Sequence, residues 1–517
     1  MREEIPSSSV FIWLNLAGPA MYSAVRISIV HREPKTSNAS TAAWTSQLMA
    51  AGPSPVWVAR MSRMQDPCSM VESMRSLTSF MEPALRSRGG FGIGLKPNAA
   101  VNGFNLVLEM IPYRGHLQTG SQGSPCMDRH VLVVRGGALG RDTGLGASHA
   151  GVVRLLASNE VEGWSLSAEV DHPLGGSAPR RLLRRWWFHP RRVRQRLKQR
   201  AKEGGRLVLL VTDQEQAHLV PRRAPRNVAK AVMVHDLFIL APRIIPLADG
   251  PMKEWSGRRG LVRRLDLRRL RRGLKRADLL ICVSEATAER CREMFPKVPV
   301  AHVPTGISLE RYAPKQEQAP EEGCALLVVG NDHARKRMGF LAKAIAACPE
   351  HVRRDLHVVR VGGGQTEAGR RSLTQAMEAA EVRLSLLGRV DDDELHRLRQ
   401  ACEALLFPSA AEGYGYPPVE AMATGLPVLV ADMPNHGSMV PLEHRLPVDD
   451  VDAWADAISD VHATWAQRTS DGTKATPRPA DESLLSHVER YSFDAQARAL
   501  RTALGRLDGE GLGASVD

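Results

Sequence analysis

Long apolar runs and paired cysteines are both missing from this sequence of 517 residues. No stretch reaches the 18 apolar residues that a spanning helix needs, so we expect no membrane-spanning helix. The seven cysteines are scattered, and none lies in a C-x2-C pair. This spacing argues against a disulfide framework and a zinc site, and it favours a reducing compartment. We therefore expect a cytoplasmic protein that holds no metal.

The charge balance is far from neutral, with a formal net charge of +13. Such an excess of basic residues predicts an anionic partner: a nucleic acid, a phosphate-bearing substrate or an anionic membrane surface. The chain is also too long for a single hydrophobic core, so we expect two or three domains.

Residues 1–126 differ in character from the rest of the chain. They are rich in Ser, Met, Pro and Gly and lack sustained helical or alternating periodicity. Such a segment buries too little apolar surface to offset its ordering entropy. At Met127 the pattern changes, because an apolar run at 131–134 and a Gly-rich turn follow at once. We predict that residues 1–126 are a disordered extension or result from a misplaced start; a small accessory domain is the alternative.

The most informative stretch of the sequence is residues 405–430. An apolar run predicts a strand, a loop with Glu412 and Gly415 follows, and a helix is expected from about Pro417. Proline at the start of a helix and glycine just past its end fit the usual asymmetry. Glu420 lies in this helix, and a second apolar run completes a βαβ unit. The loop and helix N-terminus of such a unit present backbone N–H groups to an anion.

Two other predicted strand ends carry distinctive residues. A Gly-rich turn that includes Gly144 and Gly146 follows the strand at 131–134. Such turns bind phosphate, but they also occur simply as tight connections. His235 ends another apolar run, so it points to the cleft side of an open α/β sheet. It either contacts a ligand there or bonds a loop carbonyl.

Two cations, Arg335 and Lys336, come just after the end of a strand expected near 325–330. Fixed cations at such a strand end can stabilise negative charge that develops on a leaving group. Arg337 follows directly, so the sequence leaves open which of the three cations act. A solvated helix start is the alternative.

Two segments are dense in Lys and Arg: residues 179–202 and residues 258–276. The first also carries Trp186, Trp187 and Phe188, and we expect it to form two helical pieces that meet at Pro190. Three interpretations stay open: a solvated basic helix with a buried aromatic face, an interfacial helix on anionic lipid, and a nucleic-acid contact. No nucleic-acid module accompanies the charge, so we expect no nucleic acid as a partner.

Taken in order, these motifs resemble the GT-B fold retaining glycosyltransferases of family 4, also named glycosyl transferases group 1. The resemblance rests on the E-x7-E pattern of Glu412 and Glu420 and on P-x-x-E-A-M-A-x-G-x-P-V across it. It covers about residues 130–507. It implies an α/β protein with two Rossmann-like domains that face each other across a cleft. We expect an acceptor-side domain at 127–303, a nucleotide-sugar-binding domain at 304–480, and a helix that crosses back to the first domain at 481–507.

The resemblance also implies a catalytic set of residues. Glu412 would bond the hydroxyls of the donor sugar, and Arg335 and Lys336 would neutralise the nucleotide diphosphate. His235 would contact the donor sugar or the acceptor. The family is metal-independent, and we accordingly interpret the aspartates at 391–393 as the cap of a helix rather than as metal ligands.

A further set of residues would bind the donor. By resemblance, Glu420 holds the ribose, and the backbone N–H groups of Gly415 and Tyr416 face the sugar and the diphosphate. The Gly-rich segment with Gly144 and Gly146 and the turn with Val390 border the donor. The chain has Tyr414-Gly415-Tyr416 where the family usually has Phe-Gly-Leu or Phe-Gly-Ile. We expect donor specificity to be determined there.

The resemblance predicts a retaining hexosyltransferase that needs no cofactor beyond its nucleotide-diphosphate sugar. The acceptor would be a lipid-linked, saccharide or other hydroxyl compound. The two basic segments would bring the protein to the inner face of an anionic membrane. Two alternatives stay open: a non-catalytic anion- or membrane-binding protein on a GT-B scaffold, and a GT-B sugar epimerase.

Overall fold

The computed structural model describes residues 129–136, 143–171, 176–255, 257, 260–314, 321–470 and 478–508, together with six strands upstream of them. The chain divides into two compact units, Met1–Gly123 and Ser124–Asp517. In the first unit, four strands pair antiparallel in the order β1-β3-β6-β4, and β2 pairs with β5. These strands are β1 (Ser8–Ile12), β2 (Asn15–Leu16), β3 (Ser23–His31), β4 (Val56–Ala59), β5 (Phe91–Gly92) and β6 (Phe104–Pro112). The predicted disordered or mis-assigned extension falls largely outside the described residues and stays a prediction.

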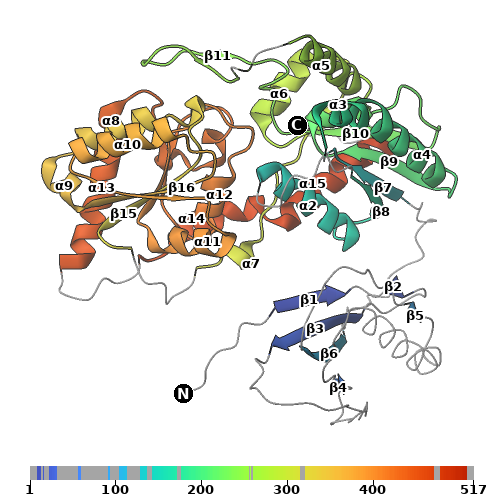
Figure 1. The fold of residues 1–517 in the computed structure, drawn as a ribbon, viewed down its shortest axis with the longest axis horizontal. Coiled ribbons are helices and arrows are strands. Elements are labelled where there is room, and N and C mark those ends of the chain that lie inside the picture. Colours follow the sequence, from blue (N-terminus) through green and yellow to red (C-terminus); the bar gives the residue numbers. More distant parts are fainter. Residues whose placement is uncertain are drawn as a thin grey trace. The chain divides into compact units, whose positions relative to one another are not determined.

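The second unit contains two lobes, each built on a six-stranded parallel sheet (Figure 1). The sheet of the N-terminal lobe has the order β14-β13-β10-β9-β7-β8. Its strands are β7 (Arg129–Val134), β8 (Ser165–Val170), β9 (Arg206–Val211), β10 (Val228–Val234), β13 (Leu279–Cys282) and β14 (Val300–His302). A separate hairpin is formed by β11 (Ile244–Ile245) and β12 (Met252–Lys253).

The helices of the N-terminal lobe connect these strands. They are α2 (Gly144–Ala157), α3 (Ala178–Leu183), the π-helical turn η1 (Arg184–Phe188), α4 (His189–Ala201), the 3-10 helix η2 (Gln214–Leu219), α5 (Leu261–Leu274) and α6 (Glu285–Met294). Helix α7 (Leu309–Tyr312) follows the last strand of this sheet and leads to the C-terminal lobe. Ser284 caps α6, because its hydroxyl accepts a hydrogen bond from the backbone N–H of Thr287. Serine is one of the residues preferred at this position.

The sheet of the C-terminal lobe has the order β17-β16-β15-β18-β19-β20, which is the strand order of a Rossmann fold. Its strands are β15 (Cys324–Val329), β16 (Leu356–Val361), β17 (Arg383–Gly388), β18 (Ala404–Phe407), β19 (Val428–Ala431) and β20 (Arg445–Leu446). The fold class predicted from the sequence, α/β with two Rossmann-like domains, is therefore confirmed.

Helices cover both faces of this second sheet (Figure 1). They are η3 (Ala334–Lys336), α8 (Met338–Ala347), α9 (Glu350–Asp355), α10 (Glu367–Ala379), α11 (Asp392–Ala401), α12 (Tyr416–Met422), η4 (Gly437–Met439), η5 (Leu442–His444), α13 (Val451–Ser470) and α14 (Glu482–Val488). The chain then continues through η6 (Glu489–Tyr491), α15 (Phe493–Gly505) and η7 (Arg506–Asp508). Asp391 caps α11 by accepting from the backbone N–H of Glu394, as the sequence predicts.

Alternate residues of each central strand enter different cores. In β15, Leu326 and Val328 pack into one buried cluster, whereas Ala325 and Leu327 pack into the cluster on the other face. This follows from the period of two along a strand, and a sheet buried on both faces needs a continuous apolar run. Runs such as Cys324–Val329 are therefore the sequence signature of these sheets.

The chain returns to the N-terminal lobe at its end. Helix α15 packs against α2 and β14, and its residue Leu500 is fully buried. The entry to α15 is tight: a side chain at Gly306 would come within 2.9 Å of the backbone of Phe493. The two lobes therefore share one hydrophobic cluster.

Two expectations about local structure need correction. Gly144 and Gly146 were expected in a flexible loop, but they form the first turn of α2. Thr143 caps this helix earlier than the apolar spacing suggests, because its hydroxyl accepts from the backbone N–H of Gly146. The basic segment was expected to break into two pieces at Pro190. Instead α3, η1 and α4 follow one another without a gap, because Pro190 lies in the first turn of α4.

Candidate functional site

The candidate site lies where the order of the C-terminal sheet reverses. Strand β15 has β16 on one side and β18 on the other, so the loops after β15 and β18 diverge at this point. In open α/β sheets, ligands bind in the crevice beyond the carboxyl ends of the strands at such a switch point. Arg335 and Lys336 follow β15, and Glu412 follows β18. The fold thus brings together three residues that the sequence predicts for the site.

These three side chains form an ion-pair cluster. The Oε1 atom of Glu412 lies 2.6 Å from Nη1 of Arg335 and 2.7 Å from Nζ of Lys336. Burial alone would raise the pKa of Glu412, but Lys336 and Arg335 outweigh it and hold that pKa at about 2. Burial lowers the pKa of Lys336, and Glu412 opposes that shift. The site is therefore a buried carboxylate held ionised by two adjacent cations.

The third candidate cation points elsewhere. Arg337 adopts a left-handed conformation with φ 52°, and its guanidinium bonds the carbonyl of Val448 and pairs with Asp449 at 2.5 Å. The guanidinium carbon of Arg337 lies 4.1 Å from the centre of the Phe340 ring. Of the three cations that the sequence left open, Arg335 and Lys336 face Glu412, and Arg337 does not.

The loop that carries Glu412 touches the N-terminal lobe at Gly413. A Cβ atom there would lie 2.4 Å from the carbonyl oxygen of His235 and 3.2 Å from Cβ of Asp236. The hydroxyl of Ser284 also donates to the carbonyl of Gly413 at 3.0 Å. Only glycine permits this approach, so the strand ends of the two lobes meet beside Glu412.

His235 lies at the end of β10, as predicted, and is buried. Its Nε2 atom is 3.0 Å from the carbonyl oxygen of Thr212, and its backbone N–H donates to Oε1 of Gln214. Burial lowers the pKa of His235 to about 4, so the ring is neutral near pH 7. With Nε2 donating to the carbonyl, Nδ1 remains as an acceptor. The loop-carbonyl bond considered from the sequence is thus present, and the contact with sugar or acceptor stays a prediction.

Two tyrosines flank Gly415 and tie the loop to the other lobe. The hydroxyl of Tyr414 donates to the carbonyl of Thr305, and the rings of Tyr414 and Tyr416 lie 5.1 Å apart, edge to face. Tyr416 approaches the first turn of α2, since a Cβ at Gly144 would be 3.3 Å from its ring. Gly415 itself has φ 132°, which a residue with a side chain rarely adopts. Tyr416 therefore joins two predicted donor-binding segments, which lie 272 positions apart in the sequence.

Glu420 lies on α12 with both carboxylate oxygens engaged. Oε1 accepts from the hydroxyl of Tyr312 at 3.0 Å, and Oε2 pairs with Nη2 of Arg399. Arg399 is almost fully buried, and its guanidinium also lies 5.4 Å from the ring of Tyr312. These contacts fix the orientation of the carboxylate that the sequence assigns to the ribose. Val390 is half-buried and packs against the same core cluster as α12.

Sequence reasoning did not find Arg399, Tyr312 or His436. Arg399 and Tyr312 lie 21 and 108 positions from Glu420 in the sequence, so no local spacing connects them. His436 is buried beside the ring of Phe407, and burial lowers its pKa to about 4. The sequence held one indication of this site: Arg399 is a charged residue on the buried face of α11.

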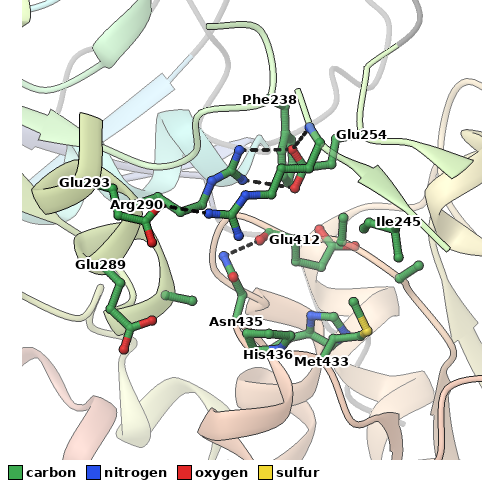
Figure 2. A pocket seen from close by; sticks show the side chains of 15 residues that line it. Phe238, Ile245, Glu254, Glu289, Arg290, Glu293, Glu412, Met433, Asn435 and His436 are labelled. Carbon is green, nitrogen blue, oxygen red and sulfur yellow. Dashed lines mark hydrogen bonds and ion pairs between the residues drawn. The ribbon is translucent and has the colours of Figure 1, made fainter. Parts of the chain in front are cut away.

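A cavity of about 190 Å³ lies next to Glu412 (Figure 2). The hairpin β11–β12 and helix α6 line it from the N-terminal lobe, and the loops after β18 and β19 line it from the C-terminal lobe. Glu254 and Arg290 form an ion pair in its wall, with Nη1 2.9 Å from Oε1. Glu254 also accepts from the backbone N–H of Arg243, which secures the base of the hairpin.

The hairpin bridges the lobes at its tip as well. The backbone N–H of Ala248 donates to Asp449 at 3.1 Å, and Asp249 pairs with Lys343 at 2.5 Å. Met252 packs against Ala410, next to the Glu412 loop. The side of the cavity is therefore closed by an element of the N-terminal lobe that rests on the C-terminal lobe.

Within the described residues, no group of three or more His, Cys, Asp or Glu side chains has the arrangement of a metal site. None of the helices in the described part of the chain combines the length and hydrophobicity that a membrane span needs.

Two Rossmann-like lobes with a site at their facing strand ends define a protein of the GT-B fold class. Residues 155–311 match the family model described as Glycosyltransferase Family 4, and residues 323–464 match the model described as Glycosyl transferases group 1. The chain belongs to these glycosyltransferase families over those two segments, as the sequence motifs indicate.

Curated relatives share part of the chain. The D-inositol 3-phosphate glycosyltransferase of Saccharomonospora viridis is 26% identical over 271 residues, which are 46% of this chain and 59% of the relative. The O-antigen chain mannosyltransferase RfbU of Salmonella typhimurium is 36% identical over 126 residues, which are 24% of this chain and 32% of the relative. The matches thus span 59% and 32% of the lengths of these two relatives.

Solved structures share the fold across both lobes. The sucrose-phosphate synthase of Thermosynechococcus elongatus has a TM-score of 0.53 at 18% identity, covering 74% of this chain and 99% of that one. HepE of Anabaena, solved in complex with UDP and glucose, has a TM-score of 0.52 at 15% identity, covering 72% and 99%. At these identities the comparison concerns the fold alone.

Proposed function

We propose that this protein is a glycosyltransferase that moves a hexose from a nucleotide-diphosphate sugar to a hydroxyl acceptor with retention at the anomeric carbon. The observation that carries the proposal is the cluster of Arg335, Lys336 and Glu412 at the switch point of the C-terminal sheet. The family matches of both lobes support transfer chemistry, and the HepE complex with UDP and glucose supports a nucleotide-sugar donor.

The cluster suits the departure of a diphosphate. Arg335 and Lys336 supply fixed positive charge where the bond between the anomeric carbon and the phosphate oxygen breaks. In the structure Glu412 pairs with both cations, which leaves the cluster with one net positive charge. When the donor binds, the diphosphate takes over the cations and Glu412 accepts hydrogen bonds from sugar hydroxyls. These two cations take the place of a metal ion in the proposed reaction, which needs no further cofactor.

Retention follows in the proposal from attack on the same face that the diphosphate leaves. The acceptor oxygen forms its bond to the anomeric carbon as the phosphate oxygen departs, and the departing phosphate oxygen takes the acceptor's proton. Close approach of the lobes at Gly413 excludes water, which would otherwise hydrolyse the donor. The acceptor class stays lipid-linked, saccharide or another hydroxyl compound.

The non-catalytic and epimerase alternatives are less favoured. Both curated relatives named above are transferases, and the ion-pair cluster is intact. We further propose a cytoplasmic location at the inner face of a membrane. It is supported by five buried free cysteines in the described part of the chain and by the two basic segments.

Product stereochemistry tests the proposal. Once a donor and an acceptor are found, proton NMR of the first product formed should show the same anomeric configuration as the donor. The rate should be unchanged by excess EDTA. An inverted product, or a rate abolished by EDTA and restored by a divalent ion, would refute the proposed mechanism.

A further inference from the structure

We propose that helix α3, the π-helical turn η1 that follows it and the first half of α5 form one docking face for an anionic lipid bilayer. This inference rests on the peripheral location proposed above and narrows the two basic segments to one defined surface. We call that surface the η1–α5 face. Its apolar members are Leu183, Trp187, Phe188, Leu261, Val262 and Leu265, and its exposed basic members are Arg180, Arg181, Arg264 and Arg268.

The apolar side chains of this face are unusually exposed. Nine large hydrophobic side chains are exposed in the described part of the chain, and six of them belong to the η1–α5 face. Trp187 is 53% exposed, Phe188 57% and Leu261 74%. The buried aromatic face considered from the sequence is therefore wrong for these two aromatic residues. Exposed apolar groups gathered in one place mark an interaction surface, whereas scattered ones do not.

A buried carboxylate joins the two parts of the face. Asp266 on α5 lies 3.1 Å from Nη2 of Arg185 and accepts from Nε1 of Trp186 at 3.1 Å. Arg269 of α5 covers the ring of Trp186 at 4.7 Å. Segments 80 positions apart in sequence are thereby held side by side, and Figure 1 shows α3 and α5 adjacent at the N-terminal lobe.

Local helix geometry determines which side chains face outward. The π turn adds a residue to the helical turn, so Trp186 faces Asp266 while Trp187 and Phe188 remain exposed. On α5, Leu261, Leu265 and Arg268 recur at intervals of four and three residues and so share one outer stripe. Both elements present apolar and basic side chains together.

The exposed charge of this region has one sign. Residues 178–202 contain eleven Lys and Arg and no Asp or Glu. Residues 261–276 contain eight Lys and Arg and a single acidic residue, Asp266, which is buried and paired. A bilayer with anionic headgroups satisfies both components, because apolar side chains enter the acyl boundary while arginines meet lipid phosphates.

Other occupants fit this face less well. In a symmetric dimer through this face, the arginines of one copy would meet those of the other, at a cost in free energy. A nucleic acid would pair with the arginines but would leave Leu261, Val262 and Leu265 in water. The bilayer is the one partner that meets both the charge and the apolar side chains.

Vesicle co-sedimentation with the full-length chain tests the inference. We expect binding to phosphatidylcholine vesicles that contain phosphatidylglycerol and little binding to pure phosphatidylcholine. Arg264→Gln with Arg268→Gln should lower the partition coefficient about 30-fold, since each arginine near the surface contributes about fivefold at low salt. The matched control is Arg370→Gln with Arg371→Gln, two exposed arginines on α10, which should change it less than about twofold.

Apolar variants separate docking from simple charge attraction. Leu261→Gln with Leu265→Gln should reduce the binding that persists in high salt, whereas Leu442→Gln, 72% exposed elsewhere, should not. Circular dichroism would verify that each variant is folded. Equal binding by wild type and face variants would overturn the inference. So would preferential capture of duplex DNA, or a concentration-dependent dimer that the face variants abolish. Nucleoside diphosphate release in solution is measured separately, so failure to dock leaves the proposed transfer reaction standing.

Discussion

Glu420 illustrates how much of a site residue's behaviour depends on partners distant in sequence. Its carboxylate is oriented by Tyr312 and held beside the buried guanidinium of Arg399. Each carboxylate oxygen can accept more than one hydrogen bond, so Glu420 keeps acceptor capacity for the ribose hydroxyls that we propose it binds. We infer that Arg399 is a positioning residue for nucleotide binding.

A substitution at Glu420 should weaken the binding of the ribose and leave the binding of the phosphates unchanged. Glu420→Gln keeps the shape but loses the charge, and hydrogen bonds to a charged group contribute about 1.5–3 kcal/mol. We expect nucleoside diphosphate to bind about 10- to 100-fold more weakly by calorimetry. Inorganic pyrophosphate, which lacks ribose, should bind as in the wild type. Equal loss for both ligands would show that Glu420 does not act on the ribose.

Asp213, near the end of β9, gives a prediction about pH. Burial, followed by the charge of Glu215, raises its pKa to about 7. Because the folded pKa lies above the unfolded value of about 3.9, the folded state holds this proton more tightly. Its contribution to stability is complete below about pH 4 and is lost as pH rises through 7.

Asp213→Asn should therefore flatten the dependence of stability on pH. The amide keeps an oxygen that accepts from the backbone N–H of Glu215, so the local turn persists. The decrease in thermal midpoint between pH 5 and pH 8 should be smaller than in the wild type. Asp393→Asn, at a fully exposed side chain, serves as the control. An unchanged decrease in Asp213→Asn would contradict the assignment.

Among the elements, the loop between β18 and α12 depends most on backbone geometry. Gly413 lets its Cα approach His235 at the end of β10, and its carbonyl accepts a hydrogen bond from Ser284 after β13. Gly413→Ala would place a methyl group 2.4 Å from the carbonyl oxygen of His235, which forces the lobes apart. A misplacement of about 1 Å costs about 100-fold in rate when a catalytic geometry depends on it.

We expect Gly413→Ala to lower kcat/KM for transfer about 100-fold while nucleoside diphosphate still binds the C-terminal lobe. Gly339→Ala is the matched control, because a Cβ there meets nothing within 4 Å and alanine favours the helix. Normal turnover in Gly413→Ala would show that this contact is not needed for reaction.

The sequence predicted the elements better than their termini and partners. Continuous apolar runs identified the parallel strands, and Asp391 identified a helix start, because these signals are local. The early start of α2 was missed since Thr143 outweighs the two glycines in its first turn. The pairing of Glu412 with Arg335 and Lys336 follows from strand order, which only the fold reveals. The E-x7-E motif indicated Glu412 and Glu420, but it did not show that two cations hold Glu412 ionised.

Across the whole molecule, α15 is the element that joins the last part of the chain to the first lobe. Leu500 on α15 is fully buried in the cluster that the lobes share. Leu500→Ala should lower the free energy of unfolding by about 2–5 kcal/mol, the range for buried leucines. Leu442→Ala, at an exposed site, should have little effect. Thermal unfolding of both variants measures this; equal midpoints would mean that α15 does not stabilise the lobes.

The central claim is that the switch-point cluster transfers sugar from a nucleotide donor. The most direct test measures nucleoside diphosphate release with UDP-, GDP- and ADP-sugars for the wild type, Lys336→Ala and Glu412→Ala. We predict acceptor-dependent release with at least one donor, at least about 100-fold slower in either variant although both remain folded. Near-normal release by either variant, or binding of a donor without any turnover, would contradict the claim.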